Sequence, residues 1–359
     1  MATENRSRPA HPSIHDVARE ANVSITTVSH AIHGTRHVAP ATRERIHAIA
    51  ASLGYRPNRL ASALRTQRTQ TVGMLVSQLR NPLVASYVEG VESVLGPTGY
   101  GLVIANTHLE AHREEQSLAL MRQLQADAVV LAAPSARLLA RVWEVANERP
   151  IALINARPPR PPKSTQPEQL SGAPIVAAIA DEAQAAEHAT GHFIRLGHRR
   201  VALIQRGETL WSTRERLAGY RRALRQVGLP FDPALVLHHE PPQATAHALI
   251  ERLLALPDSP TAAYVAPNLV GMRLVAALQD MNIPVPNRLA LVVSADEDWM
   301  QVTRPRLTAV DLPGRELGAA AARLLLDRLT ANRTVAATEP ALTVLEAPLV
   351  IRESCGANR

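Results

Sequence analysis

Five side chains that can make hydrogen bonds stand close together near the N-terminus. They are Thr26, Thr27, Ser29, His30 and His33. Apolar residues at Val28, Ala31 and Ile32 have the spacing of the inner face of a helix, so the polar side chains should share its outer face. A face of short hydroxyls and imidazoles can donate to and accept from polar groups on a partner, and the base edges of DNA are one such set.

Positive charge is concentrated in the same part of the chain. The 359 residues include 39 lysines and arginines and 32 acidic residues, a formal net charge of +7. Residues 1–70 hold ten arginines against four acidic residues, so this segment accounts for +6 and the other 289 residues for about +1. A small basic segment on a near-neutral body is typical of a polyanion-binding module attached to a part with a different task.

Three short helices are expected in this basic segment. The first covers 14–21, with Ser13 as N-cap and Asp16 as its partner in a capping box. Ser24 is placed to cap the second helix, and the third should span 40–53 and bury Leu53. Two helices joined by a tight turn and followed by a third are typical of a helix-turn-helix DNA reader, although a helical bundle without DNA function has the same periodicity.

The same residues resemble the headpiece of the lactose and galactose repressor (LacI/GalR) family. The continuous run SIHDVAREANVSITTVSH at 13–30 carries most of the resemblance, together with Thr42-Arg-Glu-Arg-Ile46 and Leu53-Gly-Tyr-Arg-Pro-Asn58. The resemblance implies that one set of residues lies on a recognition helix in the DNA major groove: Ser24, Thr26, Thr27, Ser29, His30 and His33. It adds Ser13, Tyr55 and Asn58 as further DNA contacts.

One recognition position departs from the family pattern. Many members carry an arginine where His30 stands, and arginine can contact guanine through two hydrogen bonds. Histidine is shorter, and its charge depends on pH. The operator sequence is therefore expected to differ from the common one.

A short segment that can form a helix joins the head to the body at 59–66. Alone in water it is too short to be stable. In the family the equivalent helix pairs with its twofold mate in the minor groove, and the resemblance makes Leu64 the wedge between base steps, with Ala61 one turn earlier. An ordinary linker is the alternative.

From residue 71 onward, strand-like apolar runs alternate with helical patterns. One series covers 71–154, and a second restarts at 175–180 and continues to 295. Strands separated by helices predict parallel sheets covered on both faces, and two series predict two lobes. The resemblance implies the same architecture, a periplasmic-binding-protein-like core of two doubly wound lobes that close on a small molecule. Motifs such as Leu196-Gly-His-Arg199 carry it.

The resemblance also implies an effector site at the carboxyl ends of the strands. Arg216 is expected to bond ligand hydroxyls or a carboxylate, and Asp296 to accept from hydroxyls. Asn268, Trp211 and Leu83 complete the candidate set.

Several positions in this region depart from the family pattern. Asn268 stands where aspartate is usual, Asn155-Ala156 where Asp-Arg is common, Glu182 where asparagine is common, and Leu83 where an aromatic residue is frequent. Aromatic residues make up 3% of the chain, so a stacking surface for a sugar ring is poorly supplied. Either the effector is unusual or the cleft binds none.

Enzymatic and secretory functions are not expected. No nucleophile motif, glycine-rich phosphate loop or metal-ligand box accompanies the carboxylates at 296–298, so we expect no catalysis, no cofactor and no metal. A single cysteine, Cys355, fits a reducing cytoplasm, and neither a signal peptide nor a membrane span is expected. The proline-rich stretch 157–167 should be a surface loop, with a partner-binding motif as the alternative.

Together these features predict a transcriptional regulator with an all-α headpiece at 1–57, a hinge helix and linker at 58–68, and a two-lobed effector-binding and dimerisation domain at 69–359. It should act as a repressor on a near-palindromic double-stranded DNA operator, as a homodimer with a tetramer left open, because twofold protein symmetry matches twofold DNA symmetry. Two alternatives stay open. One is the same regulator with an effector-independent cleft, and the other is a cytoplasmic small-molecule-binding protein without DNA function.

Overall fold

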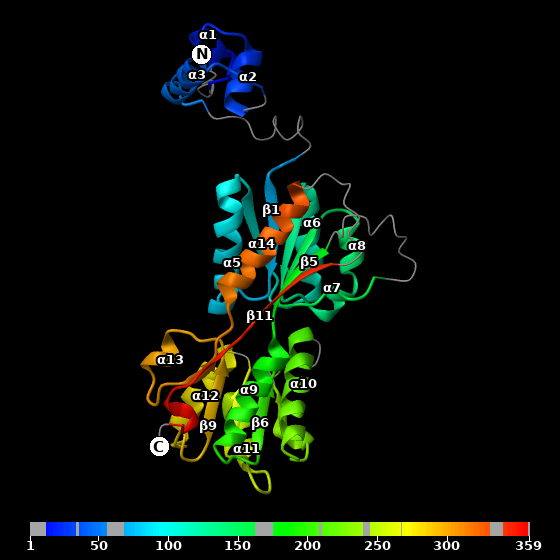
Figure 1. Cartoon of the computed structure of the whole chain (residues 1–359), viewed down its shortest axis with the longest axis vertical. Helices are drawn as coiled ribbons and strands as arrows, with labels where there is room; N and C mark the ends of the chain where they lie inside the picture. The colour runs from blue at the N-terminus through cyan, green and yellow to red at the C-terminus, as the bar shows by residue number, and fades with distance from the viewer. Residues whose placement is uncertain are drawn as a thin grey trace, which may run out of the picture. The chain divides into compact units, whose positions relative to one another are not determined.

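The computed structural model describes residues 12–33, 36–55, 68–161, 175–207, 210–239, 245–266, 268–330 and 340–357. The chain divides into two compact units, residues 1–69 and residues 70–359 (Figure 1). Each unit has its own hydrophobic core.

The first unit is helical. It contains α1 (Ile14–Glu20), α2 (Ile25–His33) and α3 (Pro40–Ser52). Its core is formed by buried apolar side chains of the helices and their connecting segments: Val17, Ala18, Ala21, Val28, Ala31, Val38, Ile46 and Ala50. The helical periodicity read from the sequence is therefore confirmed.

The helix ends are fixed by the predicted caps. Both the backbone nitrogen and the hydroxyl of Ser13 donate to Asp16 Oδ2, at 2.9 and 2.7 Å, and Ser24 Oγ accepts from the backbone nitrogen of Thr27 at 3.1 Å. The expectation that Leu53 is buried is wrong, since it is 37% exposed. Leu53 is the C-cap of α3, just before Gly54 turns the chain at φ +67°, so its side chain lies beyond the turn that packs on the core.

The second unit contains two lobes, each built on a sheet. The first sheet has the order β11-β5-β4-β3-β1-β2 and the second β12-β10-β9-β8-β6-β7. The first comprises β1 (Thr71–Val76), β2 (Gly101–Asn106), β3 (Ala128–Ala132), β4 (Ile151–Ile154), β5 (Ile175–Ala180) and β11 (Ala341–Leu345). The second comprises β6 (Val201–Gln205), β7 (Val236–His238), β8 (Ala262–Val265), β9 (Ala290–Ser294), β10 (Thr308–Val310) and β12 (Leu349–Val350). Neighbouring strands are parallel except β10 and β12, which are antiparallel.

Helices accompany both sheets, as the alternating pattern predicted. Those of the first lobe are α5 (Pro82–Leu95), α6 (Ala111–Gln123), α7 (Ala136–Ala140), α8 (Val142–Ala146) and α14 (Gly314–Thr330), with the short 3-10 turn η1 (Gly96–Thr98). Those of the second lobe are α9 (Glu182–Arg195), α10 (Trp211–Gln226), α11 (Ala246–Leu254), α12 (Asn268–Asp280) and α13 (Trp299–Val302), with η2 (Pro233–Leu235) and η3 (Glu353–Cys355). The central strands are buried along their whole length, which explains their continuous apolar sequences.

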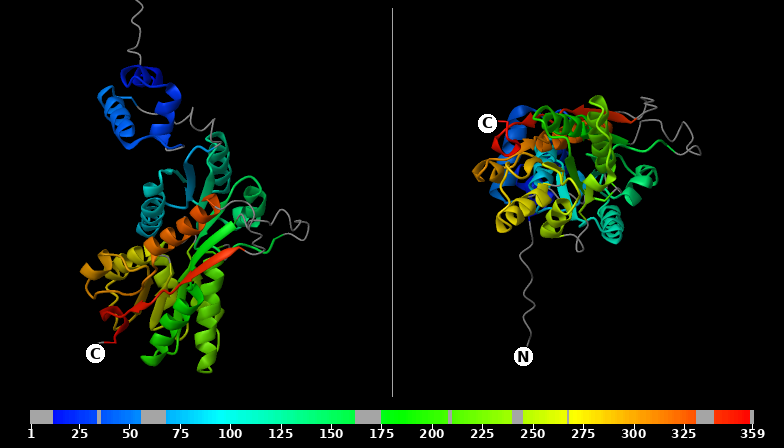
Figure 2. Two further views of the ribbon diagram at one scale, coloured as in Figure 1. Left: turned by 45° about the horizontal axis from the view of Figure 1, so that its top comes forward. Right: turned by 90° about the horizontal axis from the view of Figure 1, so that it is seen from below.

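The chain passes between the lobes three times, which corrects the predicted division into two consecutive series. The run at 175–180, predicted to begin the second lobe, forms β5, which pairs with β4 and β11 in the first sheet. The chain then enters the second lobe, returns with α14 and β11, and leaves again for β12. Figure 2 shows β11, in red, beside β5. The crossing segments are tied together, because the backbone nitrogen of Asp181 donates to Leu345 O at 2.9 Å and that of Asp311 to Pro348 O at 2.8 Å.

Helices α5 and α14 pack with their backbones close together (Figure 1). A Cβ atom added at Gly90 would lie 2.0 Å from the carbonyl oxygen of Arg315, and one at Gly318 would lie 2.2 Å from that of Tyr87. Only glycine allows this approach. The two helices pack together against the first sheet, α14 mainly on β4 and β5 and α5 on β2.

Candidate functional site

The outer face of α2 is the first candidate site. Thr26 is exposed and Thr27, Ser29 and His30 are half-buried, whereas Val28 is fully buried in the core. The predicted separation of a polar outer face from an apolar inner face is confirmed by this burial. The helix can therefore present hydroxyl and imidazole groups to a partner without disturbing the core.

The cap residues of the first unit are already engaged in local contacts. The hydroxyls of Ser24 and Thr27 lie 2.8 Å apart, and that of Ser13 bonds to Asp16. Tyr55 is half-buried against the core, and burial raises the pKa of its hydroxyl. These contacts orient the start of α2. The side chain of His33, together with Asn58, Ala61 and Leu64, lies outside the described residues, as does most of the proline-rich stretch.

The second candidate site is a cavity of about 320 Å³ between the lobes of the second unit. It lies where strands end and helices begin, with Ser77 and Gln78 following β1, Arg206 following β6, and Ser294 ending β9. This is the carboxyl edge at which parallel sheets bind ligands. The first lobe contributes the start of α5, including Leu83, which lines the cavity as a candidate contact.

Arg216 lines the cavity but is held by a carboxylate of its own chain. Its Nε and Nη2 donate to the two carboxylate oxygens of Glu182, each at 2.7 Å, and Asn155 Nδ2 donates to the same carboxylate at 2.9 Å. The side chain of Glu182 is 0% exposed and that of Arg216 is 9% exposed. Burial opposes the charged form of Arg216, but the paired carboxylate raises the pKa of Arg216 above its usual value.

The surroundings of this pair are buried and polar. Tyr264 donates or accepts a hydrogen bond with Ser294 at 2.8 Å, and burial raises the pKa of Tyr264 to about 12. Burial also raises the pKa of Tyr87, which lines the cavity on the first-lobe side. These two phenols stay neutral under physiological conditions, so they can only donate or accept hydrogen bonds here.

Asn268 joins the two lobes across the cavity. Its Nδ2 donates to Asn81 Oδ1 at 2.7 Å, and its Oδ1 accepts from Asn81 Nδ2 at 3.2 Å. The Nδ2 atom also donates to Glu297, which accepts from Trp299 as well. Asn81 caps α5 and Asn268 is the first residue of α12, so this amide pair couples the starts of two helices from different lobes.

Asp296 and Trp211 lie outside the described lining of the cavity. Arg352 donates to both carboxylate oxygens of Asp296, at 2.7 and 2.6 Å, and also to the carbonyl oxygen of Leu307. Trp211, the first residue of α10, packs on the apolar cluster of the first lobe that includes Leu75. Both residues therefore make structural contacts within the chain.

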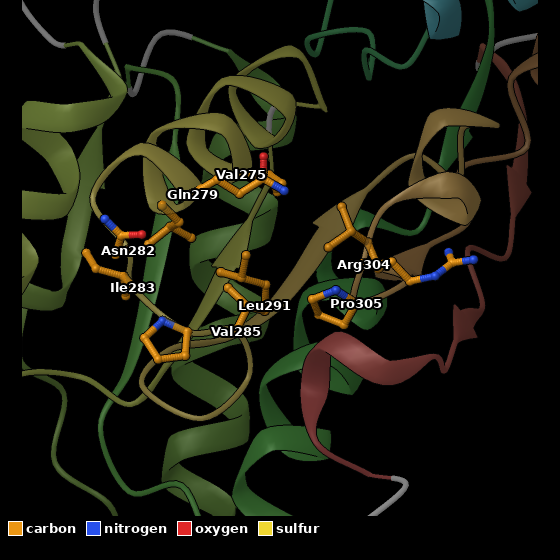
Figure 3. Close-up of a pocket in the computed structure, with 11 residues that line it drawn as sticks. Val275, Gln279, Asn282, Ile283, Val285, Leu291, Arg304 and Pro305 are labelled. Carbon is orange, nitrogen blue, oxygen red and sulfur yellow. The ribbon is translucent and has the colours of Figure 1, made fainter.

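A second cavity, of about 310 Å³, lies within the second lobe away from the interlobe edge. Its lining includes Val275, Ile283, Val285 and Leu291, and in Figure 3 the guanidinium of Arg304 points away from these apolar side chains. Arg304 instead donates to the carbonyl oxygen of Thr303. This cavity is lined mainly by apolar side chains, with Gln279 and Asn282 as its polar members besides Arg304.

Comparison with known proteins shows what these two sites belong to. Residues 13–58 match the family model for bacterial regulatory proteins, lacI family, and residues 190–355 match that for a periplasmic binding protein-like domain. The HTH-type transcriptional regulator CelR of Thermobifida fusca is 32% identical over 359 residues, which cover 97% of this chain and 99% of CelR. The chain belongs to the LacI family. It is a DNA-binding transcriptional regulator and not an enzyme.

Solved structures agree with this membership. The complex of CelR with cellobiose is similar with a TM-score of 0.68 at 30% identity, covering 96% of this chain and 99% of CelR. The lac repressor dimer bound to operator and the anti-inducer ONPF has a TM-score of 0.78 at 21% identity, with coverages of 96% and 99%, and shows the common LacI-family fold. A further relative by sequence is the HTH-type transcriptional repressor PurR of Photobacterium profundum. It is 28% identical over 319 residues, which cover 88% of this chain and 92% of PurR.

Three arginines of the cavity were missed by the sequence reasoning. Arg80, Arg206 and Arg273 all line it, yet none was among the candidates. Arg206 directly follows β6, and a charged residue immediately after a buried parallel strand is a signal that could have found it.

Within the described residues, no cluster of histidine, cysteine and acidic side chains suits a metal ion, and no helix has the length and apolar character needed to cross a membrane.

Proposed function

We propose that this LacI-family regulator is a cytoplasmic repressor that binds a near-palindromic operator as a homodimer and responds to a small molecule held between its lobes. The observation that carries the proposal is the presence, in one chain, of a helix-turn-helix unit with a polar outer face on α2 and a cavity between two lobes. The first supplies contacts to base edges and the second supplies a place where a ligand can act on domain geometry.

The proposed DNA contacts are the residues that the sequence singled out. Those on or beside described helices are Ser13, Ser24, Thr26, Thr27, Ser29, His30 and Tyr55. His33, Asn58, Ala61 and Leu64 are added from the family resemblance. Exposed Arg43 and Arg45 on α3 add positive charge to the same unit, which favours phosphate contacts.

A dimer is proposed because one recognition helix makes few base contacts. Two copies related by a twofold axis double them and match the symmetry of a palindromic site. The lac repressor, which shares the fold, has been solved as a dimer on its operator. Sedimentation of the purified protein should give twice the 38.9 kDa mass of the chain or, if dimers pair, four times that mass. A strict monomer contradicts this proposal.

The DNA proposal is tested by selecting sheared genomic DNA on the purified full-length protein. A shared, twofold-symmetric motif should emerge among the bound fragments, and fluorescence anisotropy then gives affinities for it. His30→Ala should weaken binding to that motif by about 1–3 kcal/mol, the value of a base contact. His47→Ala, an exposed histidine on α3, is the matched control and should bind as the parent does.

The proposed effector contacts are Arg216, Asn268 and Leu83 in the lining, with Trp211 and Asp296 next to it. A second candidate, an effector-independent regulator, is favoured by a specific observation: Glu182 holds Arg216 and Arg352 holds Asp296. Thermal shift against sugars, sugar acids, nucleosides and phosphates separates the two. A bound ligand at a hundred times its Kd should stabilise the protein by about 2.7 kcal/mol, whereas no response across the panel favours the second candidate.

A further inference from the structure

Three guanidinium groups of the interlobe cavity have no counterion among the described residues. Arg80, Arg206 and Arg273 line it, and within the part of the chain that the structure describes their side chains make no hydrogen bond or ion pair. Arg216, by contrast, is neutralised by Glu182. Arg80 and Arg273 are exposed and Arg206 is half-buried. The lining itself therefore carries a net positive charge, with the carboxylate of Glu297 behind it, bonded to Asn268.

Arg206 is the most enclosed of the three. It directly follows Gln205, the last residue of β6, and burial lowers the pKa of Arg206. A partly buried cation without a partner is unfavourable. Gln205 is fully buried at the same strand end, and neither its side-chain nitrogen nor its oxygen has a partner among the described residues. This end of the second sheet thus has unused hydrogen-bonding capacity, most of it as donors.

Helix dipoles add to the same charge. The starts of α5, α10 and α12 all contribute to the lining, through Leu83, Ser212 and Leu269 respectively. The N-terminus of a helix carries a partial positive charge and favours anions near it. The partial charges of these three helix ends and the charges of the three arginines all favour a negatively charged ligand.

Acidic side chains are missing from the described lining. Its polar members other than arginine are serines, amides, a phenol and a histidine. A neutral sugar needs acceptors for its many hydroxyl donors, and carboxylates are the strongest acceptors a protein can offer. The lining is better matched to a ligand that brings its own acceptor oxygens.

We propose that the effector is a small organic anion, bearing a phosphate or a carboxylate, held by Arg206 together with Arg80 and Arg273. This inference rests on the proposed function, because it names the ligand class of the same site. A guanidinium presents paired donors that match the oxygens of either group. Arg80 comes from the first lobe and Arg206 and Arg273 from the second, so one anion bonded by all three would draw the lobes together.

The test is isothermal titration of the full-length protein at constant ionic strength. The ligands are glucose 6-phosphate, gluconate, inorganic phosphate, glucose and cellobiose. We expect at least one of the three anions to bind more tightly than either neutral sugar. Arg206→Gln should raise the Kd of that anion about tenfold or more, as expected for a lost charge-assisted hydrogen bond. Arg252→Gln, on an exposed position of α11, is the matched control and should leave it unchanged.

The outcomes separate this inference from the proposed function. If a neutral sugar binds and no anion does, effector control stands and the anionic ligand class is overturned. Anion binding that Arg206→Gln leaves intact also overturns it, because the site is then elsewhere. If none of the five compounds binds, this inference fails, while effector control is judged by the thermal-shift panel and DNA binding by the operator selection. The relative strength of glucose 6-phosphate and gluconate tells phosphate from carboxylate.

Discussion

At the scale of single residues, the buried pair of Glu182 and Arg216 is the strongest electrostatic feature of the second unit. Two hydrogen bonds of 2.7 Å join them, and both side chains are removed from water. Glu182→Ala should lower the free energy of unfolding by about 3–5 kcal/mol, because it leaves an uncompensated buried guanidinium. Urea denaturation of the full-length protein measures this.

Two further variants make that measurement decisive. Glu89→Gln, at an exposed position on α5, is the control and should change stability by less than about 0.5 kcal/mol. The double variant Glu182→Leu with Arg216→Met should recover most of the loss, since apolar replacement of a buried pair is often neutral. A Glu182→Ala protein as stable as the parent would show that the pair is open to solvent.

Asp311, in a crossing segment between the lobes, gives a pH-dependent prediction. Burial raises the pKa of its carboxyl group, and the negative charges of Asp296 and Glu316 add to this. The folded state therefore holds the proton more tightly than the unfolded state, and the free energy of unfolding falls as pH rises through the raised pKa. Above the raised pKa, the ionised carboxylate of Asp311 lowers the free energy of unfolding.

Asp311→Asn should accordingly stabilise the protein at pH 7, by about 0.5 kcal/mol, the scale of a change at a partly exposed site. The advantage should shrink as pH falls through the raised pKa and vanish below the ordinary carboxyl range. Thermal denaturation of both proteins across this range checks the sign. A stability difference that does not vary with pH contradicts the assignment.

The sequence identified the polar face of α2 because periodicity separates Val28 from Thr26 and Ser29 within a few residues. It could not show that Glu182 holds Arg216 or that Arg352 holds Asp296, since these partners are 34 and 56 residues apart and meet only in the fold. The place of Arg206 directly after β6 can be read from the sequence, but its lack of a counterion cannot. A guanidinium becomes unusual only when its surroundings offer no counterion, and surroundings are not read from one sequence.

At the scale of elements, the contact between α5 and α14 depends on two glycines. Gly318→Ala would place a methyl group against the carbonyl oxygen of Tyr87, so the helices must separate. We expect a loss of about 1–3 kcal/mol, as for overpacking of a core. Gly191→Ala in α9 is the control, because a Cβ there meets only the end of the Arg195 side chain at 3.5 Å. That change should be neutral or stabilising, by up to about 1 kcal/mol.

Chemical denaturation of both glycine variants decides the matter. Equal effects of Gly318→Ala and Gly191→Ala would mean that helix propensity, and not close approach, governs position 318.

Most individual elements were predicted from apolar runs, yet the partner of a strand was not. The run at 175–180 comes 20 residues after 151–154 and precedes a helix, so its sequence alone fits either sheet. Its pairing with β11 depends on residues 341–345, which lie far along the chain.

At the scale of the whole molecule, two units with separate cores should unfold separately. The core of the first unit contains few large side chains, so its transition should be the smaller one. Ile46→Ala should lower the free energy of unfolding of the first unit only, and Leu274→Ala that of the second unit only. Each loss should be about 2–5 kcal/mol, since both side chains are fully buried. Differential scanning calorimetry of the full-length protein resolves the two. If either substitution moves both transitions together, the units are one cooperative structure.

The late return of the chain to its first sheet has a consequence for synthesis on the ribosome. When residue 180 has been added, β5 is still an open edge, with unpaired backbone groups and apolar side chains on both faces. Its neighbour β11 ends at residue 345, and α14 precedes it. The first lobe therefore stays unfinished until nearly the entire polypeptide has been translated, and during that interval it is the part of the nascent protein most in need of a chaperone.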